Sequence, residues 1–274
     1  MQIDIISDLH EDSWNPTLKL KYPCGTFYDK PYEFNNINSK YLIIAGDIAD
    51  KLDYAIDFLN HASQFYDKVF FIDGNHEHVE EYPNLYSLST IKNYIFNNKI
   101  IFLPFNEHKI NDTLFIGVNG WWDYLNNDEN EIKKCEKYLT LWNSSFDIND
   151  GKTYINSIID RANKEYKQFL NKLNLYENDK TVKNIVIVTH TIPLKKFGYS
   201  NPNDETDGLN TAYNSKFENL FKFKKISHWI FGHTHVEWNE TISFGENEIH
   251  FICNPRGRPN DYDRINYKPI TISI

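Results

Sequence analysis

The sequence has few cysteines and no long hydrophobic run. Its three cysteines, Cys24, Cys135 and Cys253, are far apart and odd in number, so they indicate neither a disulfide framework nor a zinc knuckle. No apolar stretch approaches the roughly 20 residues that a membrane-spanning helix needs. The opening MQIDIISDLH lacks the basic and apolar regions of a secretory signal. These absences predict a cytoplasmic protein that does not enter the membrane.

Positive charge is also scarce. The chain has 29 Lys and Arg against 38 Asp and Glu, which gives a formal net charge of -9. Because an acidic surface repels a phosphate backbone, nucleic acid polymers are disfavoured as partners, although a local basic patch or a bound metal could still favour an anion. A small anionic substrate remains compatible with this charge.

No interdomain linker is visible. No Gly/Ser or Pro tract separates two halves of different composition, and no internal repeat is present. A chain of 274 residues with 41% hydrophobic residues can bury a sizeable core. We therefore expect residues 1–274 to form a single domain.

Short apolar, β-branched runs recur along the chain and predict buried strands. They are QIDII (2–6), KYLIIA (40–45), KVFFI (68–72), KIIFL (99–103), TLFIGV (113–118), NIVIVT (184–189), HWIF (228–231), EIHFIC (248–253) and PITISI (269–274). An apolar stripe predicts a helix over 153–175. Because continuous apolar strands need cover on both faces, this order favours an α/β fold of two packed sheets with helices outside. The longer polar stretches 11–39, 123–152 and 195–215 are predicted to be loops or short inserted helices that line a site.

Polar side chains follow five of these strands. The motifs are SDLH with Asp8 and His10, GDIAD with Asp47 and Asp50, GNHEH with Asn75 and His76, TH with His190, and GHTH with His233 and His235. Each motif alone could be a turn, a cap or a buried histidine. Because sites in open α/β sheets form at the carboxyl ends of strands, and half of the ten histidines are among the residues just named, we expect one shared site.

The donor types indicate two metal ions. Two aspartates, four histidines and one asparagine amide oxygen are too many donors for one tetrahedral zinc. This mixture suits two divalent ions in five- or six-coordinate geometry, with Mn²⁺ preferred and Fe, Zn²⁺ or Mg²⁺ as alternatives. A bridging carboxylate would hold the ions about 3.5–4 Å apart, where they can clamp a phosphoryl oxygen and lower the pKa of a shared water. The predicted reaction is phosphoester hydrolysis.

The ordered motifs SDLH, GDIAD, GNHE, TH and GHTH, spanning 8–235, resemble the calcineurin-like metallophosphoesterase superfamily. The closing CNPRGRP (253–259) is similar to small bacterial and phage-type members, and Lys51 stands where phosphoprotein phosphatases carry an arginine. The resemblance implies a four-layer α/β/β/α sandwich of two mixed sheets flanked by helices, with a dinuclear centre at the sheet edge. It implies that one ion is held by Asp8, His10 and His235, the other by Asn75, His190 and His233, and that Asp47 bridges them. It further implies that His76 is the general acid, oriented by Asp50.

Chemistry independently favours an acid role for His76, because an alkoxide leaves poorly and an imidazolium can protonate it near neutral pH. The alternative is that His76 is an eighth ligand.

We expect His78 to be a solvated loop residue and Cys253 to be a small core residue. Arg256 is a candidate phosphate contact, or else an exposed charge in a Pro/Gly turn.

Two tryptophans, Trp121 and Trp122, stand together in NGWWDY (119–124). They either stack a base at the rim of the site or belong to the core.

The favoured function is a dinuclear phosphodiesterase acting on small nucleotides or cyclic nucleotides. The alternatives, in order, are a phosphomonoesterase or pyrophosphatase, a DNA nuclease, and a non-catalytic scaffold of the same fold.

Overall fold

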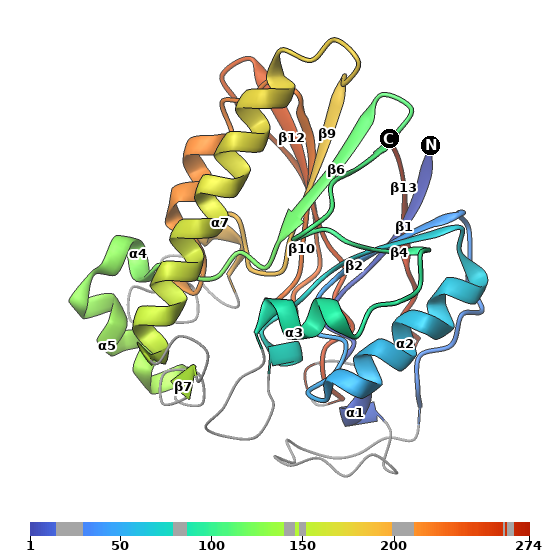
Figure 1. Cartoon of the computed structure of the whole chain (residues 1–274), viewed down its shortest axis with the longest axis horizontal. Helices are drawn as coiled ribbons and strands as arrows, with labels where there is room; N and C mark the ends of the chain where they lie inside the picture. Colours follow the sequence, from blue (N-terminus) through green and yellow to red (C-terminus); the bar gives the residue numbers. More distant parts are fainter. Residues whose placement is uncertain are drawn as a thin grey trace.

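The computed structural model describes residues 1–14, 30–78, 87–139, 146–147, 152–198, 211–259, 261 and 266–274. Two sheets form its centre (Figure 1). The first has five strands in the order β13-β1-β2-β3-β4, and the second has six in the order β11-β12-β10-β9-β6-β5. The strands are β1 Gln2–Ile6, β2 Tyr41–Ala45, β3 Lys68–Ile72, β4 Ile100–Phe102, β5 His108–Ile110, β6 Thr113–Val118, β7 Phe146–Asp147, β8 Lys152–Thr153, β9 Asn184–Thr189, β10 Ile226–Phe231, β11 Trp238–Phe244, β12 Asn247–Cys253 and β13 Ile270–Ser273.

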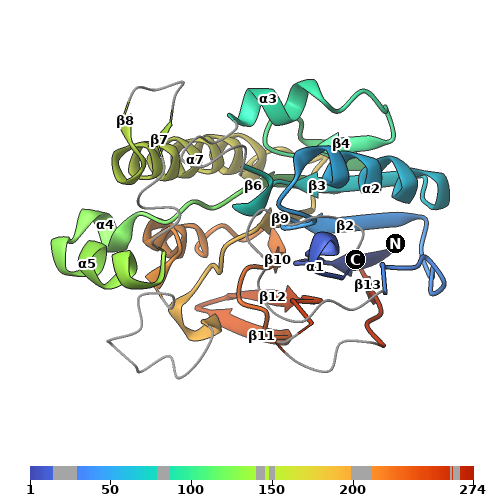
Figure 2. The same cartoon turned by 90° about the horizontal axis from the view of Figure 1, so that it is seen from below.

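Helices cover the outer faces of both sheets. The helices in the described part of the chain are α1 Glu11–Trp14, α2 Leu52–Phe65, α3 Leu88–Asn93, α4 Tyr124–Asn127, α5 Glu129–Tyr138 and α7 Tyr154–Glu177, with the 3₁₀ helices η1 His76–His78, η2 Lys195–Phe197 and η4 Ser215–Leu220. Helix α2 lies on the five-stranded sheet and α7 on the six-stranded sheet, as Figure 2 shows end-on. No helix in the described part of the chain is long and apolar enough to cross a membrane.

Alternating side chains along each strand build the layers, because successive residues of a strand point to opposite faces. Ile5 packs between the two sheets, whereas Ile6 packs under α2. Between the sheets the rings of Phe70 and Phe115 stack with their centroids 4.4 Å apart. The four-layer α/β/β/α sandwich predicted from the sequence is confirmed.

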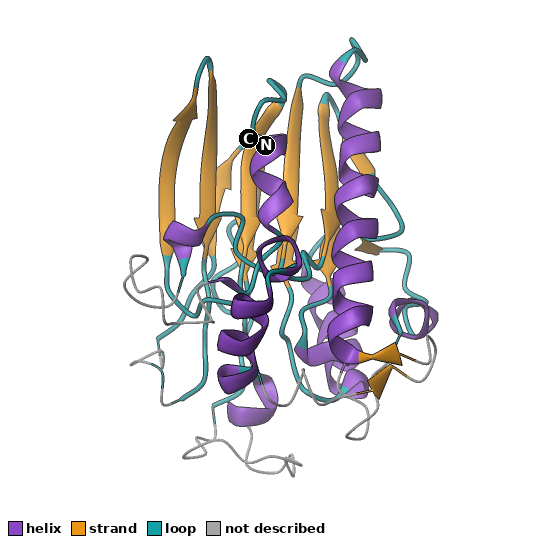
Figure 3. Cartoon of the chain, turned by 90° about the vertical axis from the view of Figure 1, so that its left-hand side faces the viewer, coloured by secondary structure: helices purple, strands orange, loops and turns teal. Residues whose placement is uncertain are grey.

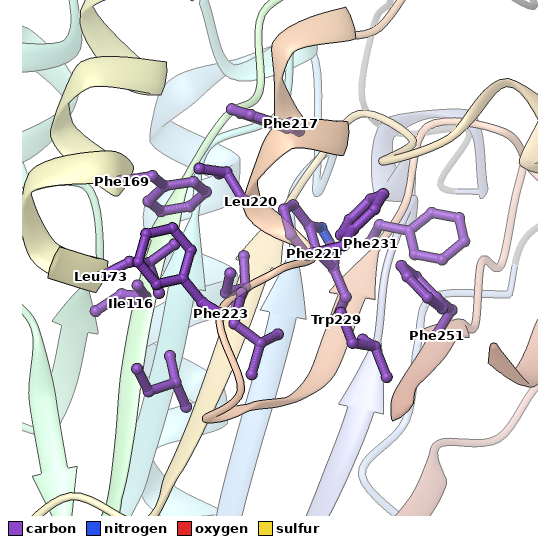
Figure 4. Packing of buried hydrophobic residues seen from close by; sticks show 14 of the residues in the cluster. Ile116, Phe169, Leu173, Phe217, Leu220, Phe221, Phe223, Trp229, Phe231 and Phe251 are labelled. Carbon is purple, nitrogen blue, oxygen red and sulfur yellow. The ribbon is translucent and has the colours of Figure 1, made fainter. Parts of the chain in front are cut away.

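The largest hydrophobic cluster lies between α7 and the six-stranded sheet (Figure 4). Phe169 and Leu173, both fully buried, extend from α7 toward Leu220 and Phe223. Burying side chains of this size stabilises the fold by roughly 1.5–3 kcal/mol each. This packing supports β6, β9 and β10, two of which carry site residues at their carboxyl ends.

The parallel strands bring those carboxyl ends to one side of the molecule. β1, β2 and β3 pair in parallel in the first sheet, and β9 and β10 do so in the second. The loops that follow these strands gather on the lower side in Figure 3. Five separate polar motifs are thereby delivered to one edge shared by both sheets.

The strands found at the predicted positions differ from the predictions by only a few residues at their ends. The edge strand β11, with the alternating sequence WNETISF, has no continuous apolar run and was not predicted. The short strand β5 was missed for the same reason. In the polar stretch 123–152, helices α4 and α5 occur, as expected of short inserted helices. Large parts of 11–39 and 195–215 lie outside the described residues.

Candidate metal centre

The side chains after β1, β2, β3, β9 and β10 meet in two adjoining clusters. In the first, ligand-type atoms of Asp8, His10 and His235 lie within 4.8 Å of one another. In the second, those of Asp47, His190 and His233 do. All six residues are buried. The structure thus brings together residues that are up to 227 positions apart in the sequence.

The backbone at this site is held in an uncommon conformation. Five of the clustered residues have left-handed φ angles, namely Asp8 at 48°, His10 at 43°, Asp47 at 55°, His233 at 70° and His235 at 51°. Such angles cost of order 1–3 kcal/mol for residues other than glycine, and they persist only where surrounding contacts enforce them. They are typical of functional sites.

Three glycines allow the loops to approach closely. A Cβ atom on Gly74 would lie 2.1 Å from Asp47 Oδ1, and one on Gly232 would lie 2.6 Å from Asp8 Oδ2. Gly46 has a φ of +79°, and a Cβ there would meet His190 Nδ1 at 2.7 Å. Any larger residue would therefore push the side chains of the two clusters apart.

The second cluster is organised around acceptor atoms. Asn75 Oδ1 lies 3.0 Å from His190 Nε2 and 3.1 Å from His233 Nδ1. His190 Nδ1 lies 2.9 Å from the carbonyl oxygen of Ala45, which fixes Nδ1 as the protonated nitrogen and turns Nε2 toward Asp47. Burial lowers the pKa of His190, but the Asp47 carboxylate outweighs burial and raises this pKa to about 10. The Asp47 carboxylate therefore stabilises positive charge on the His190 ring.

The first cluster has the same character. His10 Nε2 and His235 Nε2 lie 2.9 Å apart, and His235 Nε2 is 3.7 Å from Asp8 Oδ1. The carboxylate of Asp261 contacts His235 Nδ1 at 2.5 Å, so it orients the ring with Nε2 toward the cluster. Asp8 Oδ2 is buried without a hydrogen-bond partner among the described residues.

Asp47 stands between the clusters. Its Oδ2 atom is 3.2 Å from His190 Nε2, 3.9 Å from His10 Nε2 and 3.9 Å from His76 Nε2. Burial would raise the pKa of Asp47, but His190 and His76 hold it well below its usual range. Asp47 is therefore a carboxylate facing both clusters.

The donor set fits divalent metal ions. Buried carboxylate oxygens and imidazole nitrogens converge at near-contact distances in both clusters, and within the described residues Asp8 Oδ2 has no hydrogen-bond partner in the first cluster. None of the clustered groups is a thiolate, which argues against a closed structural zinc site. The described residues are thus able to bind metal ions.

His76 lies beside Asp47 at the more open part of the site, with 14% of its side chain exposed. Its Nδ1 atom is 2.5 Å from Asp50 Oδ1, and its Nε2 atom is 3.3 Å from Arg258 Nη2. Burial lowers the pKa of His76, but Asp47 and Asp50 together raise it above the ordinary value. This arrangement suits a proton donor, although His10, Asp50 and His76 also lie close enough together to share an ion.

Two neighbours of His76 support the loops. Glu77 is fully buried and accepts hydrogen bonds from the backbone N–H groups of Asp47 at 3.0 Å and Gly74 at 2.6 Å. The expectation that His78 is a solvated loop residue is wrong, because His78 is fully buried and its Nε2 lies 2.7 Å from Asp73 Oδ2. A short 3₁₀ turn directs both side chains inward.

Arg256 does not face the two clusters. Its guanidinium contacts the Glu11 carboxylate and the carbonyl oxygen of Lys30, and it lies 4.1 Å above the ring of Trp14. Because Arg256 is only 2% exposed, these interior partners replace the expected phosphate contact. Arg258, which the sequence indicates only as a possible exposed charge in the Pro/Gly turn, lies beside His76 instead.

The other uncertain residues are core residues. Trp121 and Trp122 are buried in a cluster under α7, where Trp122 stacks with its ring centroid 6.1 Å from that of His233. Neither is therefore placed at an exposed rim to stack a base. Cys253 is a fully buried member of the main core, as expected.

The contacts that Asp261 and Glu77 make with the site could not be predicted from the sequence. Asp261 follows the last site strand by many residues, so no spacing rule connects it with His235. Glu77 lies within GNHEH, where the sequence is compatible with a residue that supports the site and with a solvated loop residue. Only the packing of separate loops reveals that each holds a neighbour of the metal clusters.

The sandwich fold and the two clusters define an α/β protein whose sheet edge carries residues able to bind metal ions. Residues 1–237 match the family model described as calcineurin-like phosphoesterase, and the chain belongs to this family. It is 28% identical over 275 residues to the uncharacterized protein L509 of Acanthamoeba polyphaga mimivirus, a match that covers 96% of this chain and 93% of that protein.

Two solved structures share the fold. The phosphopantetheinyl hydrolase of Mycobacterium tuberculosis aligns with a TM-score of 0.63 at 16% identity, covering 96% of this chain and 92% of that one. A dimetal phosphatase from Danio rerio aligns with a TM-score of 0.55 at 12% identity, covering 99% and 91%. Membership in the calcineurin-like family, predicted from the five motifs, is confirmed.

Proposed function

We propose that the protein hydrolyses phosphoesters with two divalent metal ions, and that within this class it is a phosphodiesterase acting on small nucleotides or cyclic nucleotides. The observation that carries the proposal is the position of Asp47. It faces both clusters, and His76 stands next to it. Family membership supports the hydrolase class.

The residues would divide between two ions as their distances suggest. Asp8, His10 and His235 would hold one ion, and Asn75, His190 and His233 would hold the other. Asp47 would bridge them. When bound, two such ions polarise a phosphoryl group and lower the pKa of a water held between them. We prefer Mn²⁺, since the set mixes carboxylate, amide and imidazole donors.

His76 is proposed as the general acid. Its Nδ1 donates to Asp50, which leaves Nε2 as the atom that gives a proton to the departing oxygen. Proton donation of this kind contributes typically about 10²- to 10⁴-fold to the rate. The burial of the clusters keeps competing water from the ligand atoms.

The acidic surroundings favour a diester over a monoester. Five carboxylates lie at or beside the site, namely those of Asp8, Asp12, Asp47, Asp50 and Asp261. A diester carries one negative charge, whereas a monoester carries nearly two at neutral pH, so these carboxylates repel the monoester more strongly. A phosphomonoesterase or pyrophosphatase is the second candidate, because two metal ions and Arg258 could also neutralise a dianion.

Two broader features accompany this proposal. We propose that residues 1–274 act as one domain, since β13 near the C-terminal end pairs with β1 at the N-terminal end. We also propose a reducing, cytoplasmic location, because the three cysteines Cys24, Cys135 and Cys253 are few, far apart in the sequence and odd in number.

The test compares chromogenic esters on one preparation. Purified protein loaded with Mn²⁺ is assayed with bis(4-nitrophenyl) phosphate and 4-nitrophenyl phosphate, and then with cyclic and linear nucleotides. We expect a higher kcat/KM for the diester. A preference for the monoester would transfer the proposal to a phosphatase, and turnover of neither ester nor any nucleotide would contradict the hydrolase proposal.

A further inference from the structure

The segment after β12 returns to the metal centre and is held there by the backbone. Arg256 N donates to the carbonyl oxygen of Ser7 at 3.0 Å, and Gly257 N donates to that of Asp8 at 2.8 Å. Trp14 Nε1 donates to the carbonyl oxygen of Gly257 at 2.9 Å. These bonds fix residues 255–257 along the end of β1.

A sharp turn then separates two arginines. Gly257 has a left-handed φ of +71°, and a Cβ atom there would approach Asp261 Oδ2 to 2.9 Å. On one side of this turn Arg256 points into the interior toward Glu11. On the other side Arg258 is only partly buried, and its Nη2 lies 3.3 Å from His76 Nε2. The turn therefore directs the second guanidinium to the site.

Asp261 ties this arginine to the first metal cluster. One of its oxygens, Oδ2, accepts from the backbone N–H of Arg258 at 2.6 Å and lies 2.5 Å from His235 Nδ1. The carboxylate thus orients a candidate metal ligand and holds the backbone of Arg258 at the same time. Because one carboxylate contacts both residues, it fixes the position of the Arg258 backbone relative to His235.

We propose that Arg258 binds a non-bridging oxygen of the substrate phosphoryl group, next to the oxygen that His76 protonates. The inference rests on the proposed function, and it names a substrate contact for that site. In the structure Arg258 Nη2 donates to His76 Nε2 at 3.3 Å. Once Nε2 carries the proton that it gives to the leaving oxygen, both nitrogens are donors, and they lie close enough to contact two neighbouring oxygens of one phosphoryl group. The planar guanidinium suits such an oxyanion better than an ammonium group does.

Arg256 cannot supply this contact. It is 2% exposed, and its guanidinium already contacts the Glu11 carboxylate. Displacing it would leave a buried carboxylate without its partner, which is costly. The two arginines of PRGR therefore have different tasks, with Arg256 anchoring the segment and Arg258 contacting substrate.

The test compares Arg258→Gln and Arg258→Lys with the wild type, all loaded with Mn²⁺. The charge-matched control is Lys183→Gln, because Lys183 is 73% exposed and pairs with Asp112 at the amino end of β9. Calorimetry measures the Kd for inorganic phosphate, and kcat/KM is measured on the diester. Metal content and melting temperature are recorded for every variant.

For Arg258→Gln we expect the Kd for phosphate to rise, and kcat/KM to fall, by about 10- to 100-fold, the usual effect of losing a charged hydrogen bond. Arg258→Lys should recover part of the loss, and Lys183→Gln should match the wild type. Unchanged phosphate affinity in both Arg258 variants at full metal content would overturn the inference. If the wild type binds phosphate but hydrolyses no ester, the proposed function fails, while the phosphate affinities still decide the role of Arg258.

Discussion

The contact between Asp50 and His76 makes a quantitative prediction about pH. Asp50 Oδ1 lies 2.5 Å from His76 Nδ1, and the Asp47 and Asp50 carboxylates raise the pKa of His76 above its ordinary value, against the lowering effect of burial. A group with a raised pKa stays protonated to higher pH. A reaction that needs protonated His76 therefore proceeds below this pKa and is lost as the pH rises through it.

The substitution Asp50→Asn removes the charge and keeps the hydrogen-bond acceptor. Asp47 remains near His76 and still raises its pKa, so we expect the pKa of His76 to fall in this variant without losing the whole increase. At a pH above the pKa of His76 in both proteins, the loss of a neighbouring opposite charge typically lowers the protonated fraction about 10- to 100-fold, so turnover should slow by a similar factor. At low pH the rates should converge.

The assay is a pH profile of kcat/KM on a diester with a poor leaving group, such as a dialkyl ester or cyclic nucleotide. Asp53→Asn is the matched control, because Asp53 is an exposed carboxylate in the first turn of α2. Metal content is measured for both variants. An alkaline limb that does not move in Asp50→Asn, at full metal content, would refute the assignment of His76 as the acid.

The remaining predictions concern the same site. His76→Ala should slow hydrolysis of esters with poor leaving groups by about 10²- to 10⁴-fold but affect nitrophenyl esters far less, because their leaving groups need little protonation. The control is His61→Ala, at an exposed histidine. An equal loss on both kinds of ester, or a loss no larger than that of the control, would count against the acid role. Asp47→Asn should reduce bound metal, measured by elemental analysis, and abolish turnover, so retention of two ions would contradict a bridging role. Gly74→Ala would place a Cβ 2.1 Å from Asp47 Oδ1 and should abolish metal binding or folding. By contrast, a Cβ added at Gly245 would meet no atom within 4 Å, although the φ angle of this residue is +66°. Gly245→Ala should therefore lower the free energy of unfolding, measured by denaturant titration, by only about 1–2 kcal/mol.

The central strands and the residues that follow them could be predicted because two local signals coincide. Buried parallel strands are continuous apolar runs, and polar residues directly after them mark the sheet edge. For example, NIVIVT is followed by His190, and the structure places that side chain 3.2 Å from Asp47. Edge strand β11 carries no such signal, since its exposed side chains alternate with half-buried ones.

The supporting residues could not be predicted because their partners come from distant loops. The choice between Arg256 and Arg258 depends on the left-handed turn at Gly257, and the sequence PRGR is compatible with either direction. Similarly, His78 is buried where it contacts the carboxylate of Asp73 and the ring of Trp121, whose centroid lies 5.1 Å from that of His78. Such contacts are consequences of tertiary packing rather than of spacing.

In the proposed mechanism two metal ions, shared by Asp47, carry out phosphoester hydrolysis. The most direct measurement titrates metal-stripped protein with Mn²⁺ while the rate of diester hydrolysis and the amount of bound metal are recorded together. We predict no turnover without metal and a rise that saturates at about two ions per chain, as expected for a dinuclear centre. Full activity in metal-free protein, saturation at a single ion, or metal binding without turnover of any phosphoester would contradict the account.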